Sequence, residues 1–284
     1  MRTPSFEHLD LRPRRPGFAA WVRGLDLRQP LPDAVQAELR QALHTHEVLF
    51  LDPQPLTPEQ HLAFAQVFGP IATDSLLDRR PGEPLIDTIV NDAERPPNID
   101  VWHSDMSWHA RPPAGTVVQI TETPPLGGAT CFASTRLAYA ALSERMQTYL
   151  DGLMAEHSWE ISGLREFLLR RSPEAFAQAQ RQHPSVQHPV VLRHPDTDLP
   201  CLFVNSLFTR RIVGLDPRES QGVLQFLYQW VQRPEFVLQH DWQPHGIVVW
   251  DNRSTQHYAV ADYWPHRRVN QRVTFDATET AAGE

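Results

Sequence analysis

Two histidines and one aspartate have the types and spacing of a metal site. His103 and Asp105 stand two residues apart in the segment Trp102–Asp105, and His257 lies far along the chain. On a strand, residues two apart project to the same side, so His103 and Asp105 could aim at one point. Two imidazoles and one carboxylate are typical of non-haem Fe(II) centres that keep coordination positions open. We therefore take His103, Asp105 and His257 as candidate iron ligands and candidate catalytic residues.

The His-x-Asp spacing alone is a weak signal, because the chain has 14 histidines and will produce such spacings by chance. His44 and His46 are also two apart, but they straddle an expected helix end and strand start, so they are interpreted as a capping or packing pair. His109 is expected to contact a ligand residue at most. Zinc accepts the same donor set, so a zinc-dependent hydrolase stays open, as does a non-catalytic binding protein.

Composition excludes several classes of protein. The 284 residues carry a formal net charge of −8, whereas nucleic-acid binding usually requires a basic surface. No run approaches the ~20 apolar residues that span a bilayer. The first residues are rich in Arg and Pro and lack the apolar core of a secretory signal, so we expect a cytoplasmic protein. Cys131 and Cys201 form no CxxC pair and are interpreted as packing residues.

The elements that must position these residues are mostly strands. We expect strands at Phe6–Leu11, Ala20–Leu27, Glu47–Leu51, Leu85–Val90, Val101–Asp105, Gly115–Glu122, Ala129–Phe132, Pro189–Arg193, Leu202–Asn205, Phe236–His240, Gly246–Asp251 and Val269–Asp276. We expect helices from Asp33 to about His44, from Thr57 to Gly69, from Ser134 to about Leu150, at Pro173–Arg181 and from Pro217 to about Val231.

This order lacks the regular strand–helix alternation of a Rossmann fold or a TIM barrel. It predicts a mostly β protein with flanking helices around a double-stranded β-helix, or jelly roll, core. We expect one domain over residues 1–284, with Met1–Arg15 and Thr278–Glu284 as flexible tails. Asp33 is the expected N-cap of the first helix, and Thr57 that of the second.

Further motifs accompany the candidate metal ligands. They are Pro112-Pro113-Ala114-Gly115, Gly127-Gly128-Ala129-Thr130, Trp250-Asp251-Asn252-Arg253 continuing to His257-Tyr258-Ala259, and Arg267–Arg272. In order and approximate spacing, this set resembles the taurine/2,4-D dioxygenase (TauD/TfdA) family of Fe(II)- and 2-oxoglutarate-dependent oxygenases. The resemblance extends from about Phe6 to Thr278.

The resemblance implies a jelly-roll enzyme that uses Fe(II), 2-oxoglutarate and O₂, releases succinate and oxidises a C–H bond of a small molecule. It also implies that Thr130 and Arg268 bind the distal carboxylate of 2-oxoglutarate. A guanidinium suits that role because its planar fork matches a carboxylate. A dicarboxylate clamp argues against the zinc hydrolase, which has no need of one.

The substrate pocket departs from the taurine-cleaving members. Asp74 stands at the apparent place of a sulfonate-binding histidine and Ile99 at that of an asparagine, whereas Arg272, which contacts the sulfonate in those members, is retained. Met106, Trp108 and Phe208 complete the predicted pocket. We therefore expect taurine to be a poor substrate and favour hydroxylation of an amino-acid-like or peptide-like metabolite. The alternative is a taurine, alkylsulfonate or ether-cleaving dioxygenase. A homodimer or homotetramer is also expected.

Overall fold

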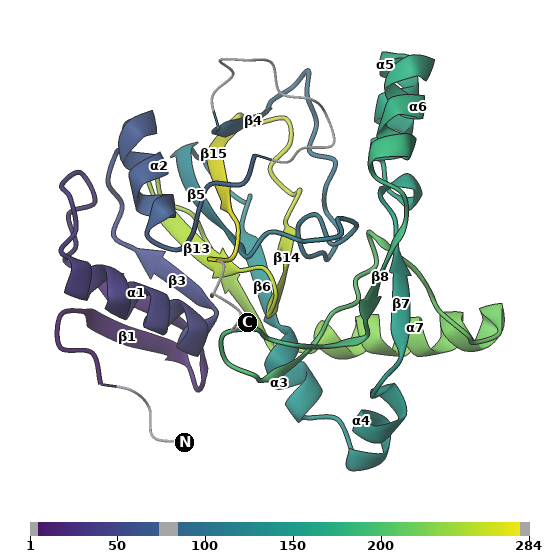
Figure 1. Ribbon diagram of the computed structural model, residues 1–284. Coiled ribbons are helices and arrows are strands. Elements are labelled where there is room, and N and C mark those ends of the chain that lie inside the picture. Colours follow the sequence, from purple (N-terminus) through teal and green to yellow (C-terminus); the bar gives the residue numbers. More distant parts are fainter. Residues whose placement is uncertain (1–4, 74–84, 279–284) are drawn as a thin grey trace.

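The computed structural model describes residues 5–73 and 85–278. Its largest element is a seven-stranded sheet (Figure 1) in the order β1 (Asp10–Arg15), β2 (Phe18–Arg23), β3 (Val48–Leu51), β13 (Ile247–Asp251), β5 (Gly115–Glu122), β15 (Arg268–Phe275) and β4 (Asp87–Asn91). A three-stranded sheet has the order β12 (Val237–His240), β6 (Thr130–Ser134) and β14 (Thr255–Ala259). The two sheets form the expected jelly-roll core.

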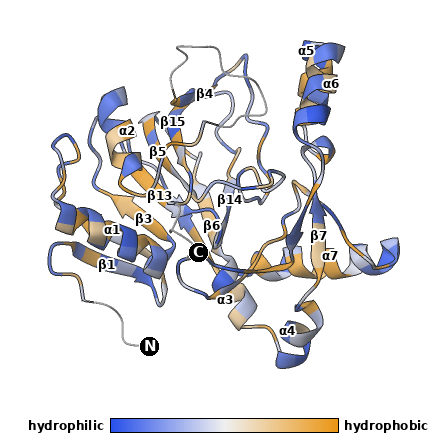
Figure 2. Ribbon diagram, in the orientation of Figure 1, coloured by the Kyte–Doolittle hydropathy of each residue, from blue (hydrophilic) through white to orange (hydrophobic). Residues whose placement is uncertain are grey.

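Alternation along β3 and β13 explains how the large sheet is covered on both faces. Phe50 and Val248 point inward and pack with Phe132 of the small sheet. Their neighbours Leu49 and Val249 point to the other face, in the cluster that includes residues of α1 (Asp33–His46) and α2 (Pro58–Gln66). A strand buried on both faces is apolar throughout, and Figure 2 shows β3 and β13 as mainly hydrophobic.

A second group of elements stands apart from the large sheet (Figure 1). A three-stranded sheet joins β11 (Thr209–Ile212), β7 (Met154–His157) and β8 (Val186–Pro189), and β9 (Val191–Arg193) pairs with β10 (Pro200–Leu202). The helices of this half of the chain are α3 (Thr135–Ala140), α4 (Glu144–Leu150), α5 (Leu164–Arg171), α6 (Pro173–Gln182) and α7 (Pro217–Val231). This inserted region, residues 154–212, supplies contacts to the candidate site described below.

Several sequence-based expectations were wrong in detail. Val101–Asp105 is not a strand; only His103 forms an isolated bridge, with His257. Asp33 is the first residue of α1 rather than its N-cap, which is Pro32, and no side chain caps this end. Asp10–Arg15 is not a tail, because it pairs with β2 along its length. By contrast, Thr57 caps α2 as expected, in a reciprocal capping box with Gln60.

The expected helix from Ser134 to Leu150 is two helices. Ser134 caps α3, and Ser143 then caps α4 by accepting a hydrogen bond from the Met146 N–H. The hydroxyl of a serine accepts hydrogen bonds from the free N–H groups at a helix start. Ser143 therefore favours the start of a new helix over the continuation of the preceding one. The short helix α5 (Leu164–Arg171) was not predicted at all.

Candidate iron and 2-oxoglutarate site

The three candidate metal ligands meet at one point although two distant segments carry them. His103 and Asp105 lie in a loop before β5, and His257 lies on β14 of the small sheet. Their nearest donor atoms all lie within 4.8 Å of one another, and in the described part of the chain this is the one group of three or more such residues. The Nε2 atoms of His103 and His257 lie 3.6 and 3.9 Å from Asp105 Oδ1.

The hydrogen bonds and charges around these residues prepare them to bind a cation. His103 Nδ1 lies 2.7 Å from the Val101 carbonyl, which favours a hydrogen on Nδ1 and leaves Nε2 free to bind. Burial, together with His103, lowers the pKa of His257 to about 3, so its imidazole is neutral. Burial alone would raise the pKa of Asp105, but His257, His103 and Arg272 outweigh it and hold it well below the ordinary value. The neutral imidazole of His257, the Nε2 of His103 and the carboxylate of Asp105 therefore face one another, and this donor set fits Fe(II).

The loop that carries His103 and Asp105 is fixed by side chains rather than by a sheet. The Asn252 carboxamide accepts from the Asp105 N–H (2.6 Å) and donates to the carbonyl groups of Asp105 (2.8 Å) and Pro113 (3.2 Å). The Ser104 hydroxyl donates to the Thr255 carbonyl (2.8 Å). Asn252 is fully buried, so water cannot reach its amide. The backbone groups of the loop supply its hydrogen bonds instead.

The residues on either side of Asn252 anchor it. Asp251 accepts from Arg253 (2.6 Å) and from His194 Nε2 (2.9 Å), and Arg253 also pairs with Asp196 at 2.7 Å. All but Asp196 are buried. The Asp-Asn-Arg motif thus combines an ionic network with an amide that holds the Asp105 loop.

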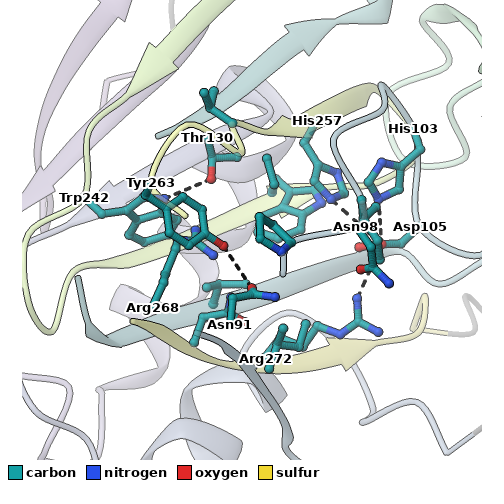
Figure 3. A pocket seen from close by; sticks show the side chains of 18 residues that line it. Asn91, Asn98, His103, Asp105, Thr130, Trp242, His257, Tyr263, Arg268 and Arg272 are labelled. Atoms are coloured by element: carbon teal, nitrogen blue, oxygen red, sulfur yellow. Dashed lines mark hydrogen bonds and ion pairs between the residues drawn. The ribbon is translucent and has the colours of Figure 1, made fainter. Parts of the chain in front are cut away.

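Thr130 and Arg268 lie in the same cavity as the three ligands (Figure 3). Arg268 is only 6% exposed and its guanidinium lies 5.7 Å from the Tyr263 ring centre. Its Nε has no hydrogen-bond partner, and no carboxylate of the described residues forms a salt bridge with it. Thr130 Oγ1 accepts from the Trp242 indole N–H (2.9 Å), so the hydroxyl hydrogen remains available to donate.

A buried cation without a counter-charge is costly, so this end of the cavity fits an anionic ligand. The motif Gly127-Gly128 permits the arrangement. Both glycines have positive φ, and a Cβ on Gly128 would lie 3.3 Å from Arg268 Cδ and 3.2 Å from the Tyr263 ring. A dicarboxylate could reach Arg268 with one end while its other end approaches the metal ligands.

Arg272 lies at the metal end of the cavity. Its guanidinium is 3.6 Å from Asp105 Oδ1 and 3.2 Å from Asp87 Oδ2, and it is about one-third exposed. Ile99 also lines the cavity, beside Asn98, and is 44% exposed. Burial opposes the charge on Arg272, but the two carboxylates raise its pKa and keep it charged.

The other predicted pocket residues lie outside the walls of this cavity. Trp108 and Phe208 are buried in one apolar cluster against which Met106 packs. The Phe208 ring is nevertheless 6.3 Å from that of His103, edge to face. Substrate contact by these three residues stays a prediction, and Asp74 lies outside the described residues.

Sequence reasoning missed several residues around the site. Asn252 lies within a motif that was identified, but its amide contacts could not be inferred from the motif. Asp87, Trp242 and Tyr263 carry no local signal that distinguishes them from ordinary strand or loop residues. Tyr263 donates to Asn91 Oδ1 (3.0 Å), which holds its ring beside Arg268.

The chain is similar to known proteins in both sequence and structure. The model of the family described as "Taurine catabolism dioxygenase TauD, TfdA family" matches residues 10–274. An alkylsulfatase from Acinetobacter baylyi is 30% identical, over 98% of this chain and 87% of its own length. An (S)-phenoxypropionate/alpha-ketoglutarate-dioxygenase from Sphingobium herbicidovorans is 31% identical, over 98% and 99%.

A crystal structure of AAD-2 in complex with Mn(II) and N-oxalylglycine superimposes with a TM-score of 0.80 at 28% identity, covering 96% of this chain and 99% of that one.

In the part of the chain that the structure describes, no helix has the length and apolar character needed to cross a membrane.

Proposed function

The chain belongs to the TauD/TfdA family of 2-oxoglutarate-dependent dioxygenases, and we propose that it oxidises a carbon next to an ester or ether oxygen of a small organic anion. The family uses Fe(II), 2-oxoglutarate and O₂. One oxygen atom of O₂ enters succinate as 2-oxoglutarate loses CO₂, and the other enters the substrate. Hydroxylation next to an ester or ether oxygen gives an unstable product that cleaves, releasing the sulfate or the phenol.

The observation that carries the proposal is one cavity lined by the three candidate ligands and by Thr130, Arg268 and Arg272. In this proposal His103, Asp105 and His257 hold Fe(II), which supplies the oxidising chemistry together with 2-oxoglutarate and O₂. Arg268 and Thr130 bind the distal carboxylate of 2-oxoglutarate. The unpartnered Nε of Arg268 supports this role, since a carboxylate would satisfy a buried donor that otherwise costs free energy.

Arg272 is the proposed anchor of the substrate anion. Its Nη1 lies 3.6 Å from Asp105 Oδ1, and the side chain is about one-third exposed, so it can accept a partner. The substrates named for the two relatives, alkyl sulfates and phenoxypropionate, both carry an anionic group beside an oxidisable carbon. These names favour the alternative of an anion-cleaving enzyme over the amino-acid-like substrate expected from the sequence.

A zwitterionic metabolite is the second candidate, and Asp87 is the observation that favours it. Its carboxylate lies 3.2 Å from the Arg272 Nε, so a negative and a positive side chain lie side by side at the metal end of the cavity. A substrate with both an ammonium and an anionic group could contact both. The aliphatic part of such a substrate would pack against Ile99.

The test is a substrate panel with Fe(II), 2-oxoglutarate and O₂. Alkyl sulfates, phenoxyalkanoates and alkylsulfonates would be compared with the same carbon skeletons bearing an amino group. Succinate formation is measured together with released sulfate or phenol. We expect at least one of the anionic compounds to release sulfate, sulfite or phenol. This release should be lost in Arg272→Gln. It should be retained in Arg267→Gln, which replaces an exposed arginine nearby and serves as the control. Turnover of amino-bearing compounds alone would favour the second candidate and overturn the first.

A further inference from the structure

Four polar side chains form a buried group behind the metal-ligand loop. They are Ser107, His157, Asn205 and Thr209, with exposed fractions of 0, 0, 1 and 5%. Ser107 follows Asp105 by two residues, and the intervening Met106 has a positive φ of 49°. His157 ends β7, Thr209 begins β11, and Asn205 precedes it in the turn after β10. The group therefore joins the loop to the inserted region at residues 154–212.

The hydrogen bonds of this group have one consistent set of donors and acceptors. Asn205 Nδ2 donates to Ser107 Oγ (2.8 Å), and His157 Nδ1 lies 3.1 Å from the same oxygen. Ser107 can then donate its own hydrogen to Nδ1, which leaves the hydrogen of the ring on Nε2. Nε2 lies 3.5 Å from Thr209 Oγ1, which also accepts from the Asn205 N–H (2.9 Å). A neutral His157 completes the set.

The same group holds Phe208 against His103. Asn205 Oδ1 accepts from the Phe208 N–H (2.9 Å), and the Phe208 carbonyl accepts from the Ser158 N–H (2.9 Å), next to His157. The Phe208 ring lies 6.3 Å from that of His103, as described above. The position of Phe208 therefore depends on Asn205 and on the end of β7.

We propose that His157 is a positioning residue that couples the inserted region to the metal-ligand loop, by orienting Ser107 on the loop and Asn205 and Thr209 behind Phe208. This inference rests on the proposed roles of His103 and Asp105 as metal ligands. His157 touches neither of them, so it acts through Ser107 and Phe208. His157 thereby controls the geometry on the substrate side of the site. An oxidant formed there must reach the substrate before side reactions consume the oxidant.

The surroundings of His157 agree with a neutral, oriented ring. Burial and the neighbouring His188 lower the pKa of His157 to about 3. Its ring stacks on Phe203 with centres 5.8 Å apart and meets His188 edge to face at 5.3 Å. His188 Nε2 lies 2.9 Å from the His109 carbonyl, which provides a second link between the inserted region and the same loop.

Other hydrogen bonds hold the metal-ligand loop against the jelly-roll core. They predict which properties should not change when His157 is replaced. The Ser104 hydroxyl donates to the Thr255 carbonyl, and the Asn252 amide bonds the N–H and carbonyl of Asp105; none of these hydrogen bonds involves His157. Metal binding and 2-oxoglutarate affinity should therefore survive the loss of His157. The expected losses are substrate affinity and the coupling of succinate formation to substrate oxidation.

The test compares His157→Phe and His157→Asn with His61→Phe. His61 is equally buried but lies on α2 and bonds the Val117 carbonyl, away from this group. Without the imidazole, Ser107 loses a buried partner. We expect His157→Phe to raise the substrate KM roughly tenfold and to increase succinate formed per product, with 2-oxoglutarate affinity within about twofold of wild type. Asn can accept from Ser107 with Oδ1, so His157→Asn should restore much of the coupling.

A second readout needs no substrate. Hydrogen exchange of residues 103–109 in the metal-free protein should be faster in His157→Phe, but not in His61→Phe. If His157→Phe does not fold, Ser107→Ala removes the same bond from the other side and should give the same result. Unchanged exchange and unchanged coupling would overturn the inference. If exchange rises but no compound of the panel is turned over, the proposed substrate fails and the positioning role stands.

Discussion

Replacing Arg268 by methionine should separate the binding of 2-oxoglutarate from the stability of the fold. Arg268 is 6% exposed, and its Nε has no partner. A structural arginine would pair with an acid, and its loss would destabilise the protein. Arg268 has no such partner among the described residues. Its removal should therefore leave the ligand-free protein as stable as wild type, or more stable, because a buried unpaired charge is lost.

The expected loss in affinity follows from the pair that Arg268 would make. A hydrogen bond to a charged group contributes about 1.5–3 kcal/mol, which corresponds to roughly 10- to 150-fold in the dissociation constant. Burial and a two-pronged contact favour the upper part of this range. The matched control is Arg267→Met. Arg267 is half-exposed and pairs with Glu122 at 2.9 Å, so its loss should change stability by less than about 1 kcal/mol and affinity little.

The assay is calorimetric titration of 2-oxoglutarate into the Mn(II)-loaded protein, together with thermal unfolding of the ligand-free protein. Manganese avoids turnover during the titration. The reasoning is refuted if Arg268→Met binds 2-oxoglutarate like wild type. It is also refuted if the variant loses several degrees of Tm without ligand, since Arg268 would then stabilise the fold rather than bind the co-substrate.

Three further results are expected. Because burial lowers the pKa of His61 and His240 from 6.5 to about 4, the unfolded chain binds more protons, and the free energy of unfolding should fall between about pH 6.5 and 4 by up to about 3 kcal/mol per histidine in denaturant titrations. Asn252→Ala should destabilise the protein by about 1–3 kcal/mol and weaken metal binding, because Asp105 loses its backbone partners; unchanged metal affinity would contradict this. Taurine should yield little sulfite, because an apolar side chain, Ile99, lines the cavity; efficient release would refute this.

Two central strands of the jelly roll could be predicted because their signals are local. The apolar runs at Glu47–Leu51 and Gly246–Asp251 correspond within one residue to β3 and β13. Thr57 and Pro58 likewise marked the start of α2 correctly. Such patterns depend only on burial and on free N–H groups at a helix start.

The loop at residues 101–105 could not be predicted for the opposite reason. Its partners, Asn252 and His257, lie far along the chain, and an apolar segment around a His-x-Asp pair has the same local pattern as a strand. The three candidate ligands could nevertheless be proposed from the sequence, because a metal site requires particular residue types whatever backbone carries them, and the structure places the three side chains together. Asp87 could not be found, because only the register of β4 against β15 sets it opposite Arg272.

The central claim is that His103, Asp105 and His257 bind Fe(II) together with 2-oxoglutarate in one cavity. The most direct measurement is the visible absorption spectrum under anaerobic conditions, with Fe(II) and 2-oxoglutarate added to the purified protein. Chelation of the iron by the 2-oxo acid should produce a weak metal-to-ligand charge-transfer band. The band should be absent in His257→Ala and should require more 2-oxoglutarate in Arg268→Met. No band in the wild-type protein, or an unchanged band in folded His257→Ala, would contradict the account.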